Sequence, residues 1–244
     1  MSLEALRADL EGAGLDVTGP LPASLYDASV TRGWYARRVR ASCRSILLVG
    51  HSGRAFWQKL QAAPEASHPD PVDTYTRRVV REAAEAHDPG APFASYLEQR
   101  EGQYLPLLTL AERAGLGAPS RLGLLLHPRL GPWWALRGAL FLEAECASTP
   151  EPQESPCTDC HAPCASSCHG RAVGADGLDR EACLGTRLVH SACHQRCDAR
   201  LACVVGREHA YEPEQLAHHA RIEWTPELRA LALRALERSK PAPG

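Results

Sequence analysis

Four cysteines fall within the twelve residues CTDCHAPCASSC, at positions 157 to 168. Sulfurs at this density have four uses in proteins: a disulfide knot, a zinc site, an iron–sulfur cluster or a reactive thiol pair. Eight of the chain's ten cysteines lie between Cys157 and Cys203. What these sulfurs hold therefore decides the chemistry of the C-terminal half.

The N-terminus indicates the compartment in which these cysteines work. MSLEALRADLEGAGLDV places acidic residues where a secretory signal has a basic flank and an apolar run. No stretch reaches the roughly 20 apolar residues that a membrane-spanning helix needs. We therefore expect a cytoplasmic protein without membrane contact. In that reducing compartment, crowded cysteines favour metal over disulfides.

The spacing of the eight cysteines favours iron–sulfur clusters over zinc. They run as C-x2-C-x3-C-x3-C, then a lone cysteine, then C-x3-C-x5-C. Two all-cysteine zinc sites usually show paired CxxC knuckles, whereas only one CxxC occurs here. Three close cysteines followed by a fourth are typical of ferredoxin-like modules, in which the fourth reaches a neighbouring [4Fe–4S] cluster. Zinc is the main alternative, and disulfides come third.

The same pattern predicts two sets of four ligands. The first cluster is expected on Cys157, Cys160, Cys164 and Cys203, and the second on Cys168, Cys183, Cys193 and Cys197. Three histidines among them, His161, His169 and His194, are alternatives to a thiolate. His169, which stands where ferredoxin-like runs have proline, competes with Cys168. Cys43 and Cys146 lie outside this stretch, and we expect ordinary core residues there.

The rest of the chain indicates a mixed α and β structure. LEALRADLEGAG, RAFWQKLQAA and DPVDTYTRRVVREAAEAH have the spacing of helices, and SILLVGHSG at 45–53 indicates a buried strand. A polar, proline-rich connector at 147–156 precedes the cysteines. YEPEQLAHHARIEWTPELRALALRALERSK then predicts two amphipathic helices, with Thr225 as the cap of the second.

Residues 121–145 carry the clearest strand pattern. Two apolar runs flank HPRLGP, which predicts an antiparallel hairpin. Strand periodicity puts Arg137 between small residues on an otherwise apolar face. A charge there needs a counter-charge, a ligand or water, because an unpaired buried charge is costly. An ion pair and a ligand contact are equally compatible with this spacing.

LLLHPRLGPWWALRGALFL resembles the cobalamin-processing family of methylmalonic aciduria and homocystinuria type C. SILLVGHSGRAFWQKL, DPVD at 70–73 and YEPEQLAHH at 211–219 match that family in the same order. The resemblance implies an α+β fold, a nitroreductase-like central antiparallel sheet with flanking helices, joined here to a cysteine-rich ferredoxin-like iron–sulfur module. The expected parts are a cobalamin-binding core at 1–146, the iron–sulfur module at 147–206, and C-terminal helices at 207–244 that pack back on the core.

The resemblance also implies a cavity for cobalamin with its nucleotide base detached (base-off). Such proteins remove the upper ligand of cobalamin, by reduction for cyanide or by alkyl transfer to glutathione, and Arg137 occupies the place of the arginine that contacts glutathione. The residues expected to bind cobalamin or glutathione are Asp70, Pro71, Asp73, His127, Pro128, Arg129, Gly131, Trp133, Trp134, Arg137 and Gly138. His127 is expected to line the cavity as a turn residue, and no catalytic residue is assigned.

The cysteine module is absent from the animal proteins of that family. It resembles the module of epoxyqueuosine reductases, which hold two [4Fe–4S] clusters on eight cysteines in the same order. We therefore expect an oxidoreductase that binds cobalamin and two [4Fe–4S] clusters, reduces cobalamin and removes its upper axial ligand by decyanation or dealkylation. The alternatives are an epoxyqueuosine reductase-like cobalamin-dependent reductase and a non-catalytic corrinoid chaperone.

Charge and register weigh against a tRNA substrate. The net charge of −2 offers little attraction to a polyanion, and 32–40 is the only candidate basic patch. The catalytic aspartate of the epoxyqueuosine reductases has no clean match, since Asp73 in VDTYTRR is out of register. The expected partners are an external electron donor such as a ferredoxin or flavin reductase, and glutathione, for a monomer or weak homodimer.

Overall fold

The computed structural model describes residues 2–146 and 151–238, which divide into two units by their contacts. The first unit comprises residues 1–118 and 133–154, and the second comprises 119–132 and 155–244. The three-part division at 146 and 206 stays a prediction. The observed units differ from it in placing 119–132 and the C-terminal helices together with the cysteines.

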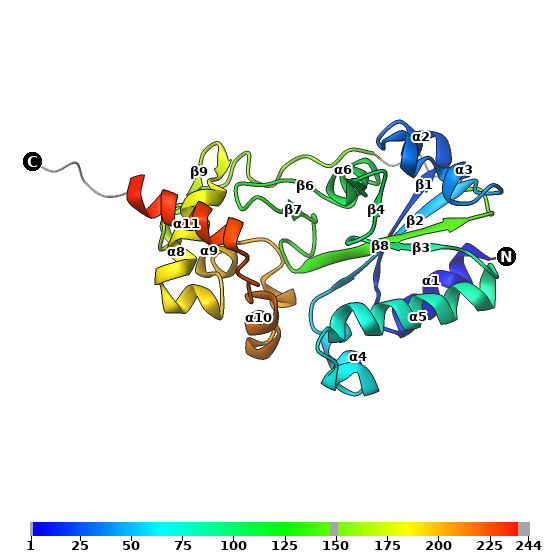
Figure 1. Cartoon of the computed structure of the whole chain (residues 1–244), viewed down its shortest axis with the longest axis horizontal. Coiled ribbons are helices and arrows are strands. Elements are labelled where there is room, and N and C mark those ends of the chain that lie inside the picture. Colours follow the sequence, from blue (N-terminus) through cyan, green and yellow to red (C-terminus); the bar gives the residue numbers. More distant parts are fainter. Residues whose placement is uncertain (1, 147–150, 239–244) are drawn as a thin grey trace, which may run out of the picture. The chain divides into compact units, whose positions relative to one another are not determined.

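The first unit is built on a four-stranded antiparallel sheet of strand order β1–β2–β8–β3 (Figure 1). Its strands are β1 (Val17–Pro22), β2 (Ser45–Ser52), β3 (Phe93–Ser95) and β8 (Trp134–Leu142). Every residue of β2 is buried, which confirms the buried strand predicted from SILLVGHSG. A small antiparallel sheet in a mixed α and β structure is thus confirmed, whereas the nitroreductase-like arrangement stays a prediction.

Helices cover both faces of this sheet (Figure 1). One face carries α1 (Leu3–Gly12), α4 (Ala55–Gln61) and α5 (Pro71–His87), and the other carries α2 (Ala23–Asp27), α3 (Ala36–Val39) and α6 (Leu107–Arg113). Short 3-10 turns span Arg32–Trp34 and Pro64–Ser67, and β4 (Gln99–Arg100) pairs with β5 (Gln103–Tyr104). Leu47 and Leu140 of the sheet pack with Phe56 and Val80 in one core cluster. Each such side chain contributes about 1.5–3 kcal/mol through burial.

The predicted hairpin at 121–145 is wrong. β8 pairs with β2 and β3, while β7 (Leu125–Leu126) forms a separate two-stranded sheet with β6 (Ala118–Pro119). Within HPRLGP, a single bridge joins His127 and Gly131. The turn packs against the segment after the last cysteine, because a Cβ on Gly131 would lie 2.1 Å from the Val205 carbonyl oxygen. That contact keeps the turn with the cysteines.

The second unit consists of helices and loops around the cysteines. Its helices are α7 (Pro163–Ser166), α8 (Arg180–Val189), α9 (Asp198–Leu201), α10 (Pro213–His219) and α11 (Pro226–Arg238), with 3-10 turns at Ser191–His194 and Arg207–His209 and a small hairpin of β9 (Val173–Gly174) and β10 (Gly177–Leu178). Asp179 caps α8 by accepting hydrogen bonds from the Glu181 and Ala182 amides. The predicted cap of α11 is confirmed, because Thr225 Oγ1 accepts from the Leu228 amide at 3.3 Å.

The long helix α11 packs on α8 within this unit. Gly185 of α8 makes the close approach of the two helices feasible, since a Cβ there would lie 3.2 Å from the Ala232 carbonyl oxygen. Over 2–146 and 151–238, none of the helices combines the length and the apolar character needed to cross a bilayer.

Candidate metal centre and ligand site

The structure brings together the four thiols predicted for the first cluster, here named the first cysteine set: Cys157, Cys160, Cys164 and Cys203. Burial raises the pKa of Cys164, and the neighbouring sulfurs of Cys157 and Cys203 raise it further. Cys164 and Cys203 are buried in a small core that also contains Leu122 and Leu126. Apolar residues of the 119–132 segment therefore position this set.

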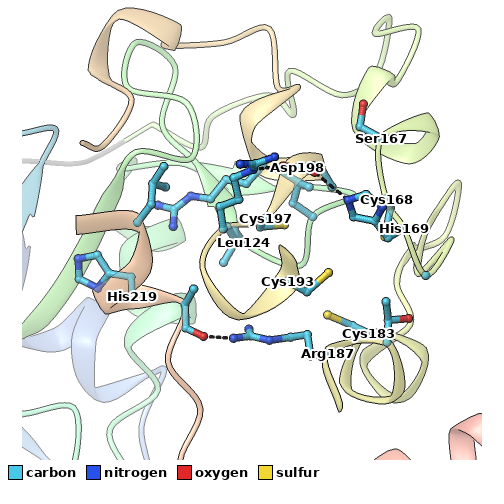
Figure 2. Close-up of a pocket in the computed structure, with 18 residues that line it drawn as sticks. Leu124, Ser167, Cys168, His169, Cys183, Arg187, Cys193, Cys197, Asp198 and His219 are labelled. Atoms are coloured by element: carbon cyan, nitrogen blue, oxygen red, sulfur yellow. Dashed lines mark hydrogen bonds and ion pairs between the residues drawn. The ribbon is translucent and has the colours of Figure 1, made fainter. Parts of the chain in front are cut away.

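The second cysteine set, Cys168, Cys183, Cys193 and Cys197, gathers in the same way. Burial raises the pKa of Cys183, an effect that the charge of Arg187 opposes and the neighbouring sulfurs reinforce. All four thiols line one pocket of about 220 Å³, which Figure 2 shows from the side of Cys183 and Cys193. One water needs only about 10–15 Å³ of such space, so the pocket is larger than a packing defect.

Backbone amides donate to two of the sulfurs. The Ala162 amide donates to Cys160 Sγ at 3.4 Å, and the Ala172 amide donates to Cys168 Sγ at 3.3 Å. Ala162 has φ 55°, and Arg171, which directly precedes Ala172, has φ 50°. Left-handed backbone costs a non-glycine residue about 1–2 kcal/mol, and such strain gathers at functional sites. Both loops therefore hold a strained conformation that turns an amide toward a cysteine sulfur.

The donor set fits iron–sulfur clusters chemically. All ten cysteines are free thiols, so none is used in a disulfide. Among the described residues, no three histidine, cysteine, aspartate or glutamate side chains lie close enough together to hold one metal ion. The four thiolates of a [4Fe–4S] cluster bind four different irons, which spreads the ligands farther apart than a single ion does. Each set offers four thiols, all buried or half-buried except the exposed Cys197, and one backbone amide donor, which is a donor set that suits such clusters.

The three histidines weighed as alternative ligands differ in their surroundings. Nε2 of His169 lies 2.7 Å from Asp198 Oδ2, and its ring stacks on His190 at 4.1 Å. Nε2 of His194 lies 2.5 Å from the Arg187 carbonyl oxygen. His161 is exposed. The structure thus engages Nε2 of His169 with a carboxylate (Figure 2), while the neighbouring Cys168 lines the pocket.

The two remaining cysteines lie in the first unit. Cys43 is a core residue, as predicted, because it is buried and its thiol donates to the Ser45 carbonyl at 3.4 Å. Burial raises the pKa of Cys43 to about 11. Cys146 is half-buried, so its expected place in the core is not what the structure shows.

Three side chains of the first unit form a polar group, here named the Asp73–Tyr96–Arg137 group. Arg137 Nη1 lies 3.5 Å from Asp73 Oδ1, and its guanidinium lies 5.4 Å from the centre of the Tyr96 ring. Burial raises the pKa of Tyr96, and the Asp73 carboxylate, which accepts a hydrogen bond from the phenol, raises it further. The side chains of Asp73 and Arg137 are only 6% and 14% exposed. The ion pair that the sequence allowed for Arg137 is therefore present, with Asp73 as its partner.

The other residues predicted for the first unit's part of the ligand site lie at the start of α5 and in or beside β8, and their role in binding stays a prediction. Asp70 precedes α5 without a side-chain capping bond, and Pro71 starts the helix. Trp133 and Trp134 are buried. Gly138 is required by strand pairing, because a Cβ there would lie 2.2 Å from the Ala94 carbonyl oxygen.

The predicted site residues of the second unit lie in the HPRLG turn. Nδ1 of His127 accepts the Arg129 and Leu130 amides at 3.1 and 3.3 Å, so His127 closes the turn. Pro128 and Arg129 are exposed, and Gly131 is buried with φ 57°. Sequence reasoning missed Tyr96 and Arg187. Only the position of Arg187, four residues after Cys183 on a helix, could have indicated it.

Solved structures share this fold. Epoxyqueuosine reductase from Streptococcus thermophilus has a TM-score of 0.51 and 15% identity, and the match covers 85% of this chain and 67% of that one. The enzyme from Bacillus subtilis has a TM-score of 0.53 and 16% identity, covering 86% of this chain and 66% of that one. A reductive dehalogenase described for B12-dependent dehalogenation has a TM-score of 0.56 and 16% identity, covering 96% of this chain and 35% of that one.

These likenesses establish the fold. The chain spans about two thirds of the length of the epoxyqueuosine reductases and about a third of the dehalogenase. No protein-family model and no curated protein matches the sequence. The resemblance to the cobalamin-processing family stays a prediction.

Proposed function

We propose that this protein is a cobalamin-dependent reductase with two [4Fe–4S] clusters, held by the first and second cysteine sets. The observation that carries the proposal is the gathering of eight free thiols into two sets of four. The shared fold supports it, because epoxyqueuosine reductases and a B12-dependent dehalogenase have it as well. A cytoplasmic location, where thiols stay reduced, is part of the same proposal.

The chain's own residues have distinct roles in this proposal. The cysteine thiolates bind the irons, and the Ala162 and Ala172 amides offset negative charge on the sulfurs. When bound, the clusters supply one-electron transfer and cobalamin supplies a cobalt centre that accepts electrons. The Asp73–Tyr96–Arg137 group offers donors and an acceptor suited to the amide groups of a corrinoid.

The substrate we favour is a small molecule. A net charge of −2 gives no general attraction to tRNA. A second candidate function is removal of the upper ligand of cobalamin itself, with glutathione as the alkyl acceptor. It is favoured by Arg137, whose half-buried guanidinium can hold a carboxylate of such a peptide. An external one-electron donor, a ferredoxin or a flavin reductase, completes either reaction.

The test begins with protein purified without oxygen, in which iron, sulfide, zinc and cobalt are counted together. We expect roughly eight irons per chain, as two [4Fe–4S] clusters. Serine substitutions at Cys160 and Cys193 should each remove one cluster, whereas Cys43→Ala should leave the iron content unchanged. Zinc in place of iron would contradict the proposal.

The second step separates the two candidate functions from a corrinoid chaperone. Cluster-loaded protein is reduced chemically and mixed with cyanocobalamin in a single turnover, and in parallel with cobalamin and a halogenated phenol. Loss of cyanide alone supports upper-ligand removal, and release of halide supports a cobalamin-dependent reductase of small molecules. Binding of cobalamin without either reaction would leave the chaperone as the function.

A further inference from the structure

A cationic side chain lies beside the second cysteine set. Arg187 follows Cys183 by four residues on α8, so the two share one face of the helix. Both line the pocket of the second set, and Figure 2 draws Arg187 next to Cys183 and Cys193. The opposite face of α8 is fixed by α11, which approaches Gly185. The helix therefore has little freedom to turn Arg187 out of the pocket.

The structure holds the guanidinium of Arg187 in place. One Nη donates to the Ala220 carbonyl oxygen at the end of α10. Its Nε is buried and, among the described residues, has no hydrogen-bond partner. An N–H buried without a partner is costly, so its persistence at this position indicates an acceptor that belongs to the pocket. The sulfurs that line the same pocket are acceptors of this kind.

Among the described residues, the cation that acts on the first cysteine set is Arg207, next to Cys203. The electrostatic neighbours of Cys164 are the other three sulfurs of its own set. Arg207 approaches Cys203, where its Nε donates to the Cys203 carbonyl oxygen at 3.2 Å. Arg207 is exposed, however, and solvent and salt screen an exposed charge far more than a partly buried one. The positive charge beside the second set is thus less screened than that beside the first, and Asp198, which lies near Cys193, opposes part of it.

The charge difference has a consequence for electron transfer. One electron added to a cluster increases its negative charge by one unit, with no bond formed or broken. A fixed positive charge nearby therefore stabilises the reduced cluster more than the oxidised one.

We propose that Arg187 raises the reduction potential of the cluster on the second cysteine set above that of the cluster on the first. With clusters bound, an electron from a low-potential one-electron donor would be held more favourably by the cluster on the second set, beside Arg187, than by the cluster on the first. The inference rests on the proposed function, because it requires clusters on both sets. Arg187 acts here as a positioning residue for charge, without contact to a substrate.

The test is a redox titration of the anaerobically purified, cluster-loaded protein, followed by electron paramagnetic resonance. In the unaltered protein, the cluster with the higher potential should be the one lost in Cys193→Ser and kept in Cys160→Ser. Arg187→Met should favour the oxidised form of that cluster by about tenfold, which is about 59 mV for one electron. Arg187→Lys, which keeps the charge, should retain most of the potential.

Arg180→Met provides the matched control, since Arg180 lies on the same helix but is exposed. It should shift neither potential. Equal potentials in Arg187→Met and the unaltered protein would overturn the inference, and so would a shift in Arg187→Lys as large as in Arg187→Met. If Arg187→Met does not fold, the order of the two potentials in the unaltered protein decides, and a higher potential for the first set overturns the inference.

Failure of the proposed function has a different signature. Protein that carries zinc, or no iron, fails at the metal count before any potential is measured. Protein that carries both clusters but shows no effect of Arg187 leaves the proposed function intact and removes only this inference.

Discussion

The packing of the HPRLG turn against the last cysteine segment makes a sharp prediction for Gly131→Ala. Gly131 has φ 57°, and a Cβ there would lie 2.1 Å from the Val205 carbonyl oxygen. Gly206 completes the contact from the other side, since a Cβ on it would lie 2.4 Å from the Leu130 carbonyl oxygen. Backbone atoms cannot rotate away as a side chain can, so the turn or the 203–206 segment has to move.

The magnitude follows from two costs. The left-handed backbone costs alanine about 1–2 kcal/mol. Overpacking adds about 1–3 kcal/mol. Gly90→Ala is the matched control, because Gly90 has φ 74° but open space around its Cβ position, so that only the backbone cost applies. For a chain of this size, 1 kcal/mol shifts the melting temperature by roughly 2–4 °C. Gly131→Ala should therefore melt roughly 2–12 °C below Gly90→Ala.

The assay is thermal unfolding of both variants as cluster-loaded protein, with bound iron counted after purification. Gly131→Ala should also lose part of its iron, because the displaced segment carries Cys203. Equal melting temperatures and equal iron contents in the two variants would refute the packing of the turn against residues 203–206.

Three further predictions concern the first unit. Burial opposes ionisation of Asp88, but hydrogen bonds from Arg40, at 2.8 Å, and from a backbone amide outweigh it and lower the pKa of Asp88. The ionised Asp88 therefore stabilises the folded protein above about pH 4, and this contribution is lost as the pH falls further. Asp88→Asn should lower the free energy of unfolding at pH 7 by about 3–5 kcal/mol. In urea unfolding, the stability of this variant should also depend less on acid than that of the unaltered protein. An unchanged acid dependence would argue against the ion pair. Burial raises the pKa of Cys43 to about 11, so this thiol should resist alkylation at pH 8 in the native protein. Mass analysis of the peptides measures the labelling, and rapid labelling of Cys43 would count against its burial. Asp73→Asn should lower the pKa of Tyr96, measured as the absorbance difference from Tyr96→Phe, and no change would exclude contact between the two side chains.

Local sequence patterns predicted the longest helices of the first unit and its central buried strand. The helical spacing of LEALRADLEG and PVDTYTRRVVREAAEAH matches α1 and α5, and the apolar run at 45–52 matches β2. These patterns succeed because each element buries one stripe or both faces in a single core. The hairpin at 121–145 failed for a physical reason. An apolar run shows that a strand is buried, but it does not identify the strand with which it pairs.

The cysteine sets were predictable because the cysteines follow a ferredoxin-like order, a group of four, a lone cysteine and a group of three, and the structure gathers the same two groups of four. Their surroundings were not predictable. Tyr96 comes from a loop after β3 and meets Asp73 only through tertiary contacts. The role of Arg187 could not be predicted without knowing which face of α8 lines the pocket. Such contacts depend on how the elements pack, and they cannot be predicted from the spacing of residues within one element.

The strained loops connect the fold to the chemistry of the sulfurs. Ala162 and Arg171 are left-handed without being glycine, and each lies where an amide turns toward a cysteine sulfur. A weak hydrogen bond to a neutral thiol offsets little of the roughly 1–2 kcal/mol that each conformation costs. The same amide facing an ionised, metal-bound thiolate makes a charge-assisted hydrogen bond, which is about twice as strong. The two loops are therefore better suited to thiolates that hold a metal cluster than to the free thiols alone.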